Sequence, residues 1–254
     1  MGTFGQLWKN LKSAAGNGKG AEEASIMEAY RKGDYWTARL HAVDPPFIAS
    51  MLLQVGQVEQ AAQIFQKLLD TKTEPKTAAV ANSDLAQAFL ELRQYDRALQ
   101  CLRTAQILWQ ERGSTDRMIA ELWLRRGSNS AEALRAAQRA VEKERAGEGL
   151  PPEGKNANLC EALATLAWAT AVESLDAAVD YLLPEAVSLS GTNPVCATSR
   201  MHLHFGHAYA ALGNMAKTMK HYEEAARLDP NGLSGRAAAE LVAMAAGVCV
   251  PVLA

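Results

Sequence analysis

The stretch that decides the fold of this chain is HLHFGHAYAALGNMAKTMKHYEEAARLDP, residues 202–230. It contains two segments whose apolar residues recur with the period of a helix, separated by a glycine that ends the first. An apolar residue and a glycine precede an aromatic in the first segment, and the second segment ends at Asp-Pro. The residues that define this pattern are Phe205, Gly206, Tyr209, Gly213, Tyr222, Ala225 and Pro230. The pattern predicts two helices joined by a short turn.

This arrangement resembles the tetratricopeptide repeat (TPR), a unit of about 34 residues with W-x2-L-G-x2-Y followed by Ala, Phe, Ala and Pro at fixed offsets. His202 stands in the Trp position and Thr218 in one of the Ala positions. The resemblance implies an all-α protein, a right-handed α-solenoid of antiparallel helix pairs with a C-terminal capping helix.

Weaker copies of the pattern precede this repeat, at residues 42–75, 79–112, 114–147 and 160–193. Each has two apolar stripes at helical spacing split by a turn, as a helix-turn-helix unit requires. A truncated first unit has helices expected over 21–32 and 35–43, and Asp44, Pro45 and Pro46 break the second. Gly33, Gly56 and Gly213 fall between paired helices and are expected in the left-handed conformation.

The chain is therefore expected to have five parts. Residues 1–20 are an N-terminal amphipathic helix and a flexible linker, and residues 21–147 are TPR-like repeats with a truncated first unit. Residues 148–156 are a loop because Gly and Pro are dense there. Residues 157–232 hold the remaining repeats, and residues 233–254 hold the capping helix and an apolar tail.

Composition and charge exclude several classes of function. A formal net charge of -2 and an isoelectric point near 6.2 indicate no nucleic-acid partner. No apolar run approaches the roughly 18 residues that cross a bilayer, and no signal-peptide pattern follows Lys9 and Lys12. The four cysteines form no C-x-x-C pair, so we expect small buried apolar residues rather than disulfides or a zinc site. These features predict a cytoplasmic protein without membrane contact.

No pattern in the chain points to catalysis, a cofactor or a metal. No nucleophile elbow and no H-E-x-x-H motif occur, and GNGKG at residues 16–20 lacks the spacing of a phosphate loop. His204 and His207 share a helix face, but no carboxylate or cysteine near them in sequence completes a metal site. The expectation is a protein that is not an enzyme.

The resemblance also implies a concave groove lined by the first helix of each repeat, where a partner peptide or helix binds. The predicted groove residues are Gln87, Met118, Leu122, Arg125, Trp168, Arg200, Leu203 and His207. The alternative is that several of these side chains only pack within the array. TPR proteins that hold chaperone C-termini use a clamp of Lys, Asn and Arg; Pro46, Ser50, Val80, Ser83, Asp84 and Gln87 occupy those positions here, so the resemblance does not extend to that clamp.

Near the N-terminus, a second candidate contact has apolar residues at i, i+3, i+4 and i+7: Phe4, Leu7, Trp8 and Leu11. This segment caps the first repeat, binds a partner, or attaches weakly to a membrane surface. The function we expect is a non-enzymatic adaptor or scaffold that binds another protein in the groove. The alternative is a structural subunit that self-associates or joins a larger assembly through its terminal helices and apolar C-terminal tail.

Overall fold

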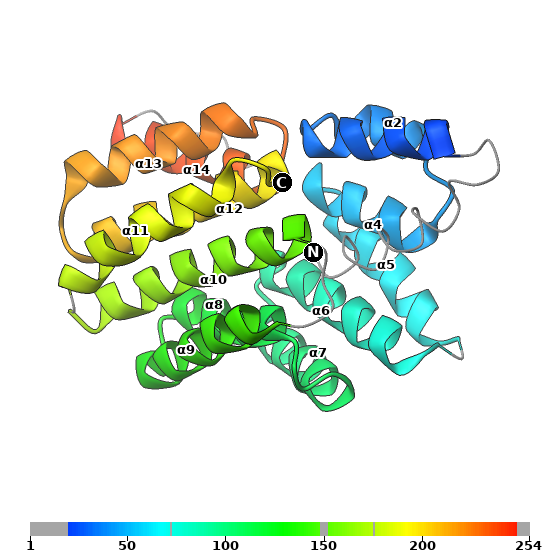
Figure 1. The fold of residues 1–254 in the computed structure, drawn as a ribbon, viewed down its shortest axis with the longest axis horizontal. Helices are drawn as coiled ribbons and strands as arrows, with labels where there is room; N and C mark the ends of the chain where they lie inside the picture. Colours follow the sequence, from blue (N-terminus) through cyan, green and yellow to red (C-terminus); the bar gives the residue numbers. More distant parts are fainter. Residues whose placement is uncertain (1–19, 72, 148–151, 175, 248–254) are drawn as a thin grey trace.

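The computed structural model describes residues 20–71, 73–147, 152–174 and 176–247. Every regular element within these ranges is an α-helix (Figure 1). The helices are α2 (Gly20–Arg31), α3 (Tyr35–His41), α4 (Pro45–Gln54), α5 (Val58–Leu69), α6 (Pro75–Glu91), α7 (Tyr95–Leu108), α8 (Gly113–Arg126), α9 (Ser130–Ala146), α10 (Pro152–Val172), α11 (Asp176–Ser190), α12 (Val195–Ala211), α13 (Met215–Leu228) and α14 (Leu233–Ala245).

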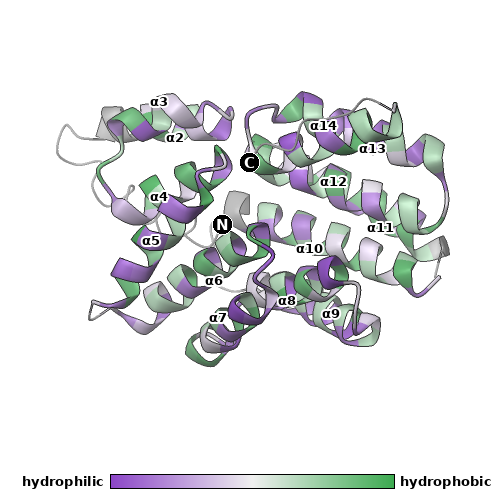
Figure 2. Ribbon diagram, turned by 180° about the vertical axis from the view of Figure 1, so that it is seen from behind, coloured by the Kyte–Doolittle hydropathy of each residue, from purple (hydrophilic) through white to green (hydrophobic). Residues whose placement is uncertain are grey.

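Consecutive helices pack as pairs, and each pair packs on the next. The pairs are α2–α3, α4–α5, α6–α7, α8–α9, α10–α11 and α12–α13, and α14 packs on α12 and α13 at the end of the array. This confirms the predicted all-α solenoid with a C-terminal capping helix. Hydrophobic and hydrophilic residues alternate along the helices (Figure 2).

Small residues set the distance between helices within a pair. The fourth residue of α3, α5, α7 and α9 is a fully buried alanine: Ala38, Ala61, Ala98 and Ala133. In the last pair, Gly206 of α12 lies directly against Tyr222 of α13. A Cβ atom at residue 206 would come within 2.3 Å of Tyr222 Cε1, which explains the glycine of the sequence signature.

The turn within each pair places at least one residue in the left-handed region. Gly33, Gly56 and Gly213 have φ of 81°, 84° and 72°, which confirms the conformation predicted for them. Arg93 and Ser174 occupy the same place in two other pairs, with φ of 56° and 60°. The turn itself therefore accepts residues other than glycine.

Two prolines begin helices, although α3 ends at His41 before the break predicted at residues 44–46. Pro45 is the first residue of α4 and Pro152 is the first residue of α10. The first residue of a helix needs no N–H donor, and the φ of proline suits the helix, so this position accepts it. As a result, residues 152–156 of the segment expected as a loop over 148–156 are helical.

The array curls until its first and last units meet (Figure 1). The Tyr35 hydroxyl at the start of α3 donates a hydrogen bond of 2.7 Å to Asp229 Oδ2, which follows α13. Arg236 of α14 donates a bond of 2.7 Å to the Gln54 carbonyl oxygen at the end of α4. The helix pairs thus form a closed ring, and the first helices of the pairs turn one face toward its interior.

Candidate protein-interaction surface

The interior of the ring buries many polar side chains. Residues 79–90 of α6 and residues 113–122 of α8 are all buried, so these helices have no solvent-exposed face over those stretches. Since a fully buried helix carries no amphipathic stripe, the inward residues cannot be recognised from apolar periodicity alone. Several are charged, and their pairing decides the properties of the surface.

A buried ion cluster joins α8, α10 and α12. Arg117 Nη1 lies 2.9 Å from Glu121 Oε2, and Arg117 Nε lies 3.3 Å from Glu161 Oε2. Arg200 Nη1 approaches the same Glu161 oxygen at 3.4 Å. These four side chains are at most 5% exposed, so solvent screens the pairs little. Two guanidinium groups and two carboxylates balance each other in charge.

The cluster holds the Glu121 carboxylate in the ionised form. Burial alone raises the pKa of Glu121, but Arg125, His204, Arg117 and Arg200 outweigh it and bring the pKa well below its ordinary value. Burial disfavours the charged form of Arg200, yet Glu161 and Glu121 raise its pKa overall. His204 has a strongly lowered pKa because it is buried, and it is therefore neutral at pH 7.

At the side of the cluster facing α6, a polar chain reaches partly exposed residues. Gln87 Nε2 and Arg125 Nη1 each donate a 2.8 Å hydrogen bond to Glu91 Oε1. Arg125 Nε also lies 3.2 Å from Glu121 Oε1, which connects this chain to the buried cluster. The Arg125 side chain is 24% exposed, so a guanidinium group remains available at this edge.

On its other side the cluster meets an aromatic strip. The rings of Trp168 and His207 have centroids 4.5 Å apart, and the ring of His204 lies 5.4 Å from Trp168. His207 Nδ1 is 2.8 Å from the Tyr222 hydroxyl. Burial, with a smaller contribution from Arg125, lowers the pKa of His207 to about 4. The strip is therefore uncharged at pH 7 and offers flat apolar area.

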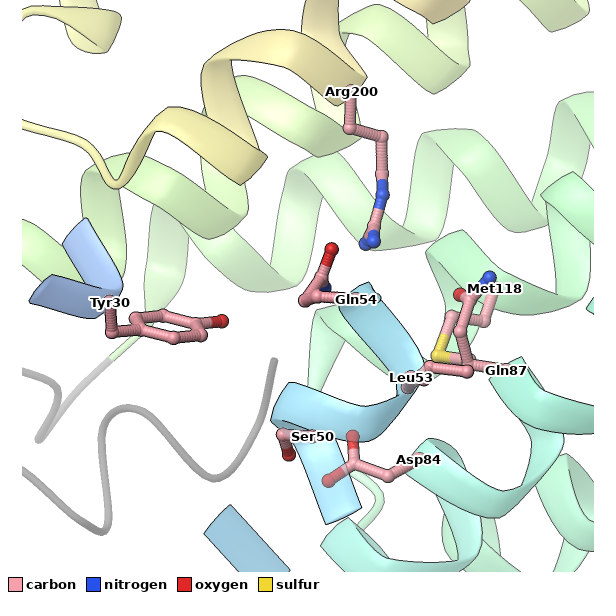
Figure 3. A pocket seen from close by; sticks show the side chains of 8 residues that line it. All are labelled: Tyr30, Ser50, Leu53, Gln54, Asp84, Gln87, Met118 and Arg200. Carbon is pink, nitrogen blue, oxygen red and sulfur yellow. The ribbon is translucent and has the colours of Figure 1, made fainter. Parts of the chain in front are cut away.

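One pocket opens on the inner face, and side chains from α2, α4, α6, α8 and α12 converge on it (Figure 3). Its volume is about 390 Å³, counted together with the solvent at its mouth. It combines apolar side chains with an acid, a cation and amides. The lining residues are Tyr30, Ser50, Leu53, Gln54, Asp84, Gln87, Met118 and Arg200.

Six of the eight groove residues named from sequence lie on this inner surface. Gln87, Met118 and Arg200 line the pocket, and Arg125, Trp168 and His207 belong to the polar chain and the aromatic strip. The other two residues fill the hydrophobic core between helices. Leu122 is 0% exposed, and Leu203 is 4% exposed against Tyr222 and α14, so both contribute to packing.

The carboxylates of the surface, Glu91, Glu121 and Glu161, were not among the residues named from sequence. The i, i+4 spacing of Arg117, Glu121 and Arg125 was a signal, although such spacing is usual on solvated helices. The predicted N-terminal contact residues Phe4, Leu7, Trp8 and Leu11 lie outside the described residues.

The part of the chain that the structure describes has neither a metal-binding cluster nor a membrane-spanning helix. No three His, Cys, Asp or Glu side chains there are grouped to hold a metal ion. His202 and His221 pair through their Nδ1 atoms at 2.9 Å. No helix among the described residues has both the length and the apolar character to cross a bilayer. Cys160 and Cys196 are buried, as predicted, whereas Cys101 is only half-buried.

Comparisons with known proteins identify the repeat. The tetratricopeptide repeat family matches residues 47–79 and 199–231. No curated protein sequence matches the chain.

Solved structures with a similar arrangement include three of low sequence identity. BtubC from P. vanneervenii is 16% identical, with a TM-score of 0.50 over 87% of this chain and 90% of that one. MamA is 14% identical, with a TM-score of 0.44 over 74% of this chain and 96% of that one. YrrB, described as a TPR protein with an unusual peptide-binding site, is 19% identical, with a TM-score of 0.39 over 87% and 98%. At these identities the likeness to BtubC supports the fold alone.

Proposed function

This chain is a tetratricopeptide repeat protein, and from that premise we propose that it is a scaffold that binds a segment of a partner protein on its inner surface. One observation carries the proposal. A continuous set of contacts runs from Gln87 through Glu91 and Arg125 to the buried ion cluster and on to the aromatic strip. Polar and aromatic groups from α6, α8, α10 and α12 therefore share one surface.

The chemistry of this surface indicates what the partner segment contains. Trp168 and His207 offer a flat apolar contact, and Met118 lines the pocket. Apolar anchors, one of them aromatic, suit these groups. Arg125, still partly exposed at the edge, fits an acidic residue beside the anchors. We propose an extended or helical peptide with this composition. The N-terminal segment that contains Trp8 is proposed as a second contact.

Replacing Trp168 by alanine tests the surface. We expect the amount of partner bound to fall at least about tenfold, because removal of an aromatic anchor typically costs about 2 kcal/mol of binding free energy. The measurement is affinity capture from the native cell with quantitative mass spectrometry, followed by binding of the purified partner. Circular dichroism establishes that the variant is folded.

Tyr181→Ala is the matched control, because this aromatic is 78% exposed on the outer helix α11. It should retain every partner that the unaltered chain binds. If Trp168→Ala binds the partner as well as the unaltered chain does, or if only Tyr181→Ala loses it, the inner surface is not the binding site.

A second candidate function is self-association, and exposed apolar residues on α3 and just after its end favour it. Trp36, Leu40 and Val43 are 50%, 80% and 91% exposed. Counted from the buried alanine of each helix, the same positions hold Glu59, Gln63 and Gln66 in α5 and Asp96, Gln100 and Arg103 in α7. An outer face that is polar in the neighbouring repeats is thus apolar in the first, as expected of a contact surface.

The Leu40→Gln substitution tests self-association, since it gives α3 the residue type of α5 and α7. If α3 joins two copies, the average mass of the unaltered chain should rise with concentration, and that of Leu40→Gln should stay at the monomer value. Sedimentation equilibrium measures both. Ile107→Gln is the control, because Ile107 is an exposed apolar residue of α7 with 77% exposure. A monomer at every concentration would exclude this candidate.

A further inference from the structure

The contacts that close the ring lie partly in its interior. The Tyr35 hydroxyl donates to Asp229 Oδ2 at 2.7 Å in a buried environment. The Tyr30 hydroxyl and Cys196 Sγ are 3.6 Å apart, also buried. Desolvation raises the pKa of Asp229, which is consistent with a carboxylate enclosed by the closure. These pairs connect the first unit with the two ends of the last repeat.

Further contacts surround this buried pair. The Gln54 carbonyl oxygen accepts from Arg236, and Gln54 Oε1 accepts from the Leu233 N–H at 3.4 Å. At the opposite edge, Arg31 Nη2 donates to the Thr192 carbonyl oxygen at 3.1 Å. All of these bonds involve at least one side chain, and no backbone-to-backbone bond joins the two ends among the described residues.

The closure is weaker than the other joints of the ring. Elsewhere, large hydrophobic clusters cross from one repeat to the next, as in the cluster that extends from Ala49 of α4 to Ala137 of α9. The first unit has its own smaller cluster around Tyr30, Tyr35 and Phe47, and Cys196 is its one buried member from the last repeat. Since apolar burial supplies most of the stability of a helix interface, this joint should separate first.

Two turn glycines show that close approach across this joint constrains the sequence. A Cβ atom at Gly33 would lie 3.0 Å from Val195 Cγ2 and 3.1 Å from Asp229 Oδ1, both beyond the joint. A Cβ atom at Gly56 would lie 2.9 Å from Arg236 Nη2. Gly213 has the same left-handed conformation, but a Cβ atom there would meet nothing within 4 Å. Because Arg93 and Ser174 take this conformation in other turns, the turn alone does not require glycine, and at residue 33 a side chain would also have to fit against Val195 and Asp229 across the joint.

We propose that this joint is a reversible latch that controls access to the inner surface. The inference rests on the proposed function. In the closed ring Gln87, Met118 and Arg200 are 6%, 3% and 4% exposed, so a partner segment cannot cover them as they stand. Separation of α2–α4 from α12–α14 exposes the inner surface at one end while the other joints stay packed. Partner binding and ring closure are then mutually exclusive.

Two native thiols report the state of the latch. Cys196 is 1% exposed within the joint, and burial raises its pKa to about 11. Cys160 is 0% exposed and its pKa is about 12 for the same reason, but it bonds to the Ala186 carbonyl oxygen between α10 and α11. Alkylation of Cys196 therefore follows opening of the latch, and alkylation of Cys160 follows unfolding of the array.

The experiment compares alkylation rates in three full-length proteins: the unaltered chain, Gly33→Asn and Gly213→Asn. Asparagine tolerates the left-handed conformation, so both substitutions perturb the turn similarly and differ in the space around the side chain. We expect Gly33→Asn to speed alkylation of Cys196 by N-ethylmaleimide at least about tenfold while Cys160 keeps its rate. In Gly213→Asn the ratio of the two rates should equal that of the unaltered chain. Mass spectrometry of tryptic peptides gives each rate.

Tyr35→Phe is the milder second variant, since it removes only the hydroxyl that bonds Asp229. Tyr35→Phe should also speed alkylation of Cys196, by a smaller factor than Gly33→Asn does, and leave the rate of Cys160 unchanged. The latch is refuted if Cys196 keeps its rate in both variants, or if Cys196 and Cys160 accelerate together in both. A partner captured through the Trp168 surface should bind Gly33→Asn more tightly. If Cys196 becomes reactive but the affinity for the partner does not rise, the latch does not control binding. If Trp168→Ala binds the partner as well as the unaltered chain does, the proposed function itself is refuted.

Discussion

Replacing Arg117 by alanine is expected to lower the free energy of unfolding by about 3–5 kcal/mol, the largest effect we expect from a single substitution. Arg117 is 2% exposed and pairs with both Glu121 and Glu161. Without it, the carboxylates of Glu91, Glu121 and Glu161 face only Arg125 and Arg200, and one negative charge has no compensating partner. Urea denaturation followed by circular dichroism at pH 7 measures the loss.

A second substitution separates charge from volume. Glu161→Gln in the Arg117→Ala background leaves two carboxylates, Glu91 and Glu121, and two cations, Arg125 and Arg200, so part of the lost stability should return. No recovery would mean that the loss comes from the vacant volume and not from charge. Arg227→Ala is the control on an exposed pair, because Arg227 is 67% exposed beside Glu224, and it should leave the denaturation midpoint unchanged.

The Gly206→Ala substitution should destabilise the last repeat by about 3 kcal/mol, toward the upper end of overpacking effects. The added Cβ would lie 2.3 Å and 2.4 Å from two atoms of the Tyr222 ring. Alanine in the middle of a helix is normally favoured over glycine by about 0.5–1 kcal/mol, so a loss of stability here has to come from the steric clash. Thermal denaturation and urea denaturation both report it.

A double-mutant cycle assigns the clash to its partner. Tyr222→Leu removes the ring, and the double variant should be more stable than the sum of the two single effects predicts. Additive effects would show that Tyr222 is not the side chain that excludes alanine. Gly191→Ala provides the control: a Cβ atom there meets nothing within 4 Å, and the substitution should be close to neutral.

The fold could be predicted from sequence because the information in a helical repeat is local. Phe205, Gly206, Tyr209 and Tyr222 lie within one pair of helices, and their spacing alone indicates how the two helices cross. The expected Gly33 and Gly213 turns follow in the same way, from helix ends a few residues away. The misplaced boundary near Pro152 arose because proline is excluded from helix interiors but accepted at their first turn.

The inner surface could be predicted only in part. Trp168, Arg125 and Arg200 were placed on the inward side because the resemblance assigns that side to first helices. The pairing of Arg117 with Glu161, and of Arg200 with the same carboxylate, depends on the distance between three helices of different repeats. That distance is a property of packing across repeats. No spacing along the chain encodes it.

Ring closure could not be predicted from the sequence, for a related reason. Tyr35 and Asp229 are 194 residues apart, and their meeting depends on small rotations between repeats that accumulate along the whole array. Glycine at residues 33 and 56 is compatible with the closure, but the left-handed turn accounts for glycine there equally well. Arg93 and Ser174 adopt the same left-handed conformation in other pairs, which shows that the turn does not require glycine.

Closure also limits how a protein of this type can change in length over evolution. In an open solenoid each repeat touches only its neighbours, so duplication or loss of a unit lengthens or shortens the molecule and leaves the rest intact. Here one additional helix pair would carry Asp229 away from Tyr35 and separate the two ends. Relatives that keep the Tyr35 and Asp229 pair should therefore have the same number of helix pairs, with insertions confined to the loops on the outer rim.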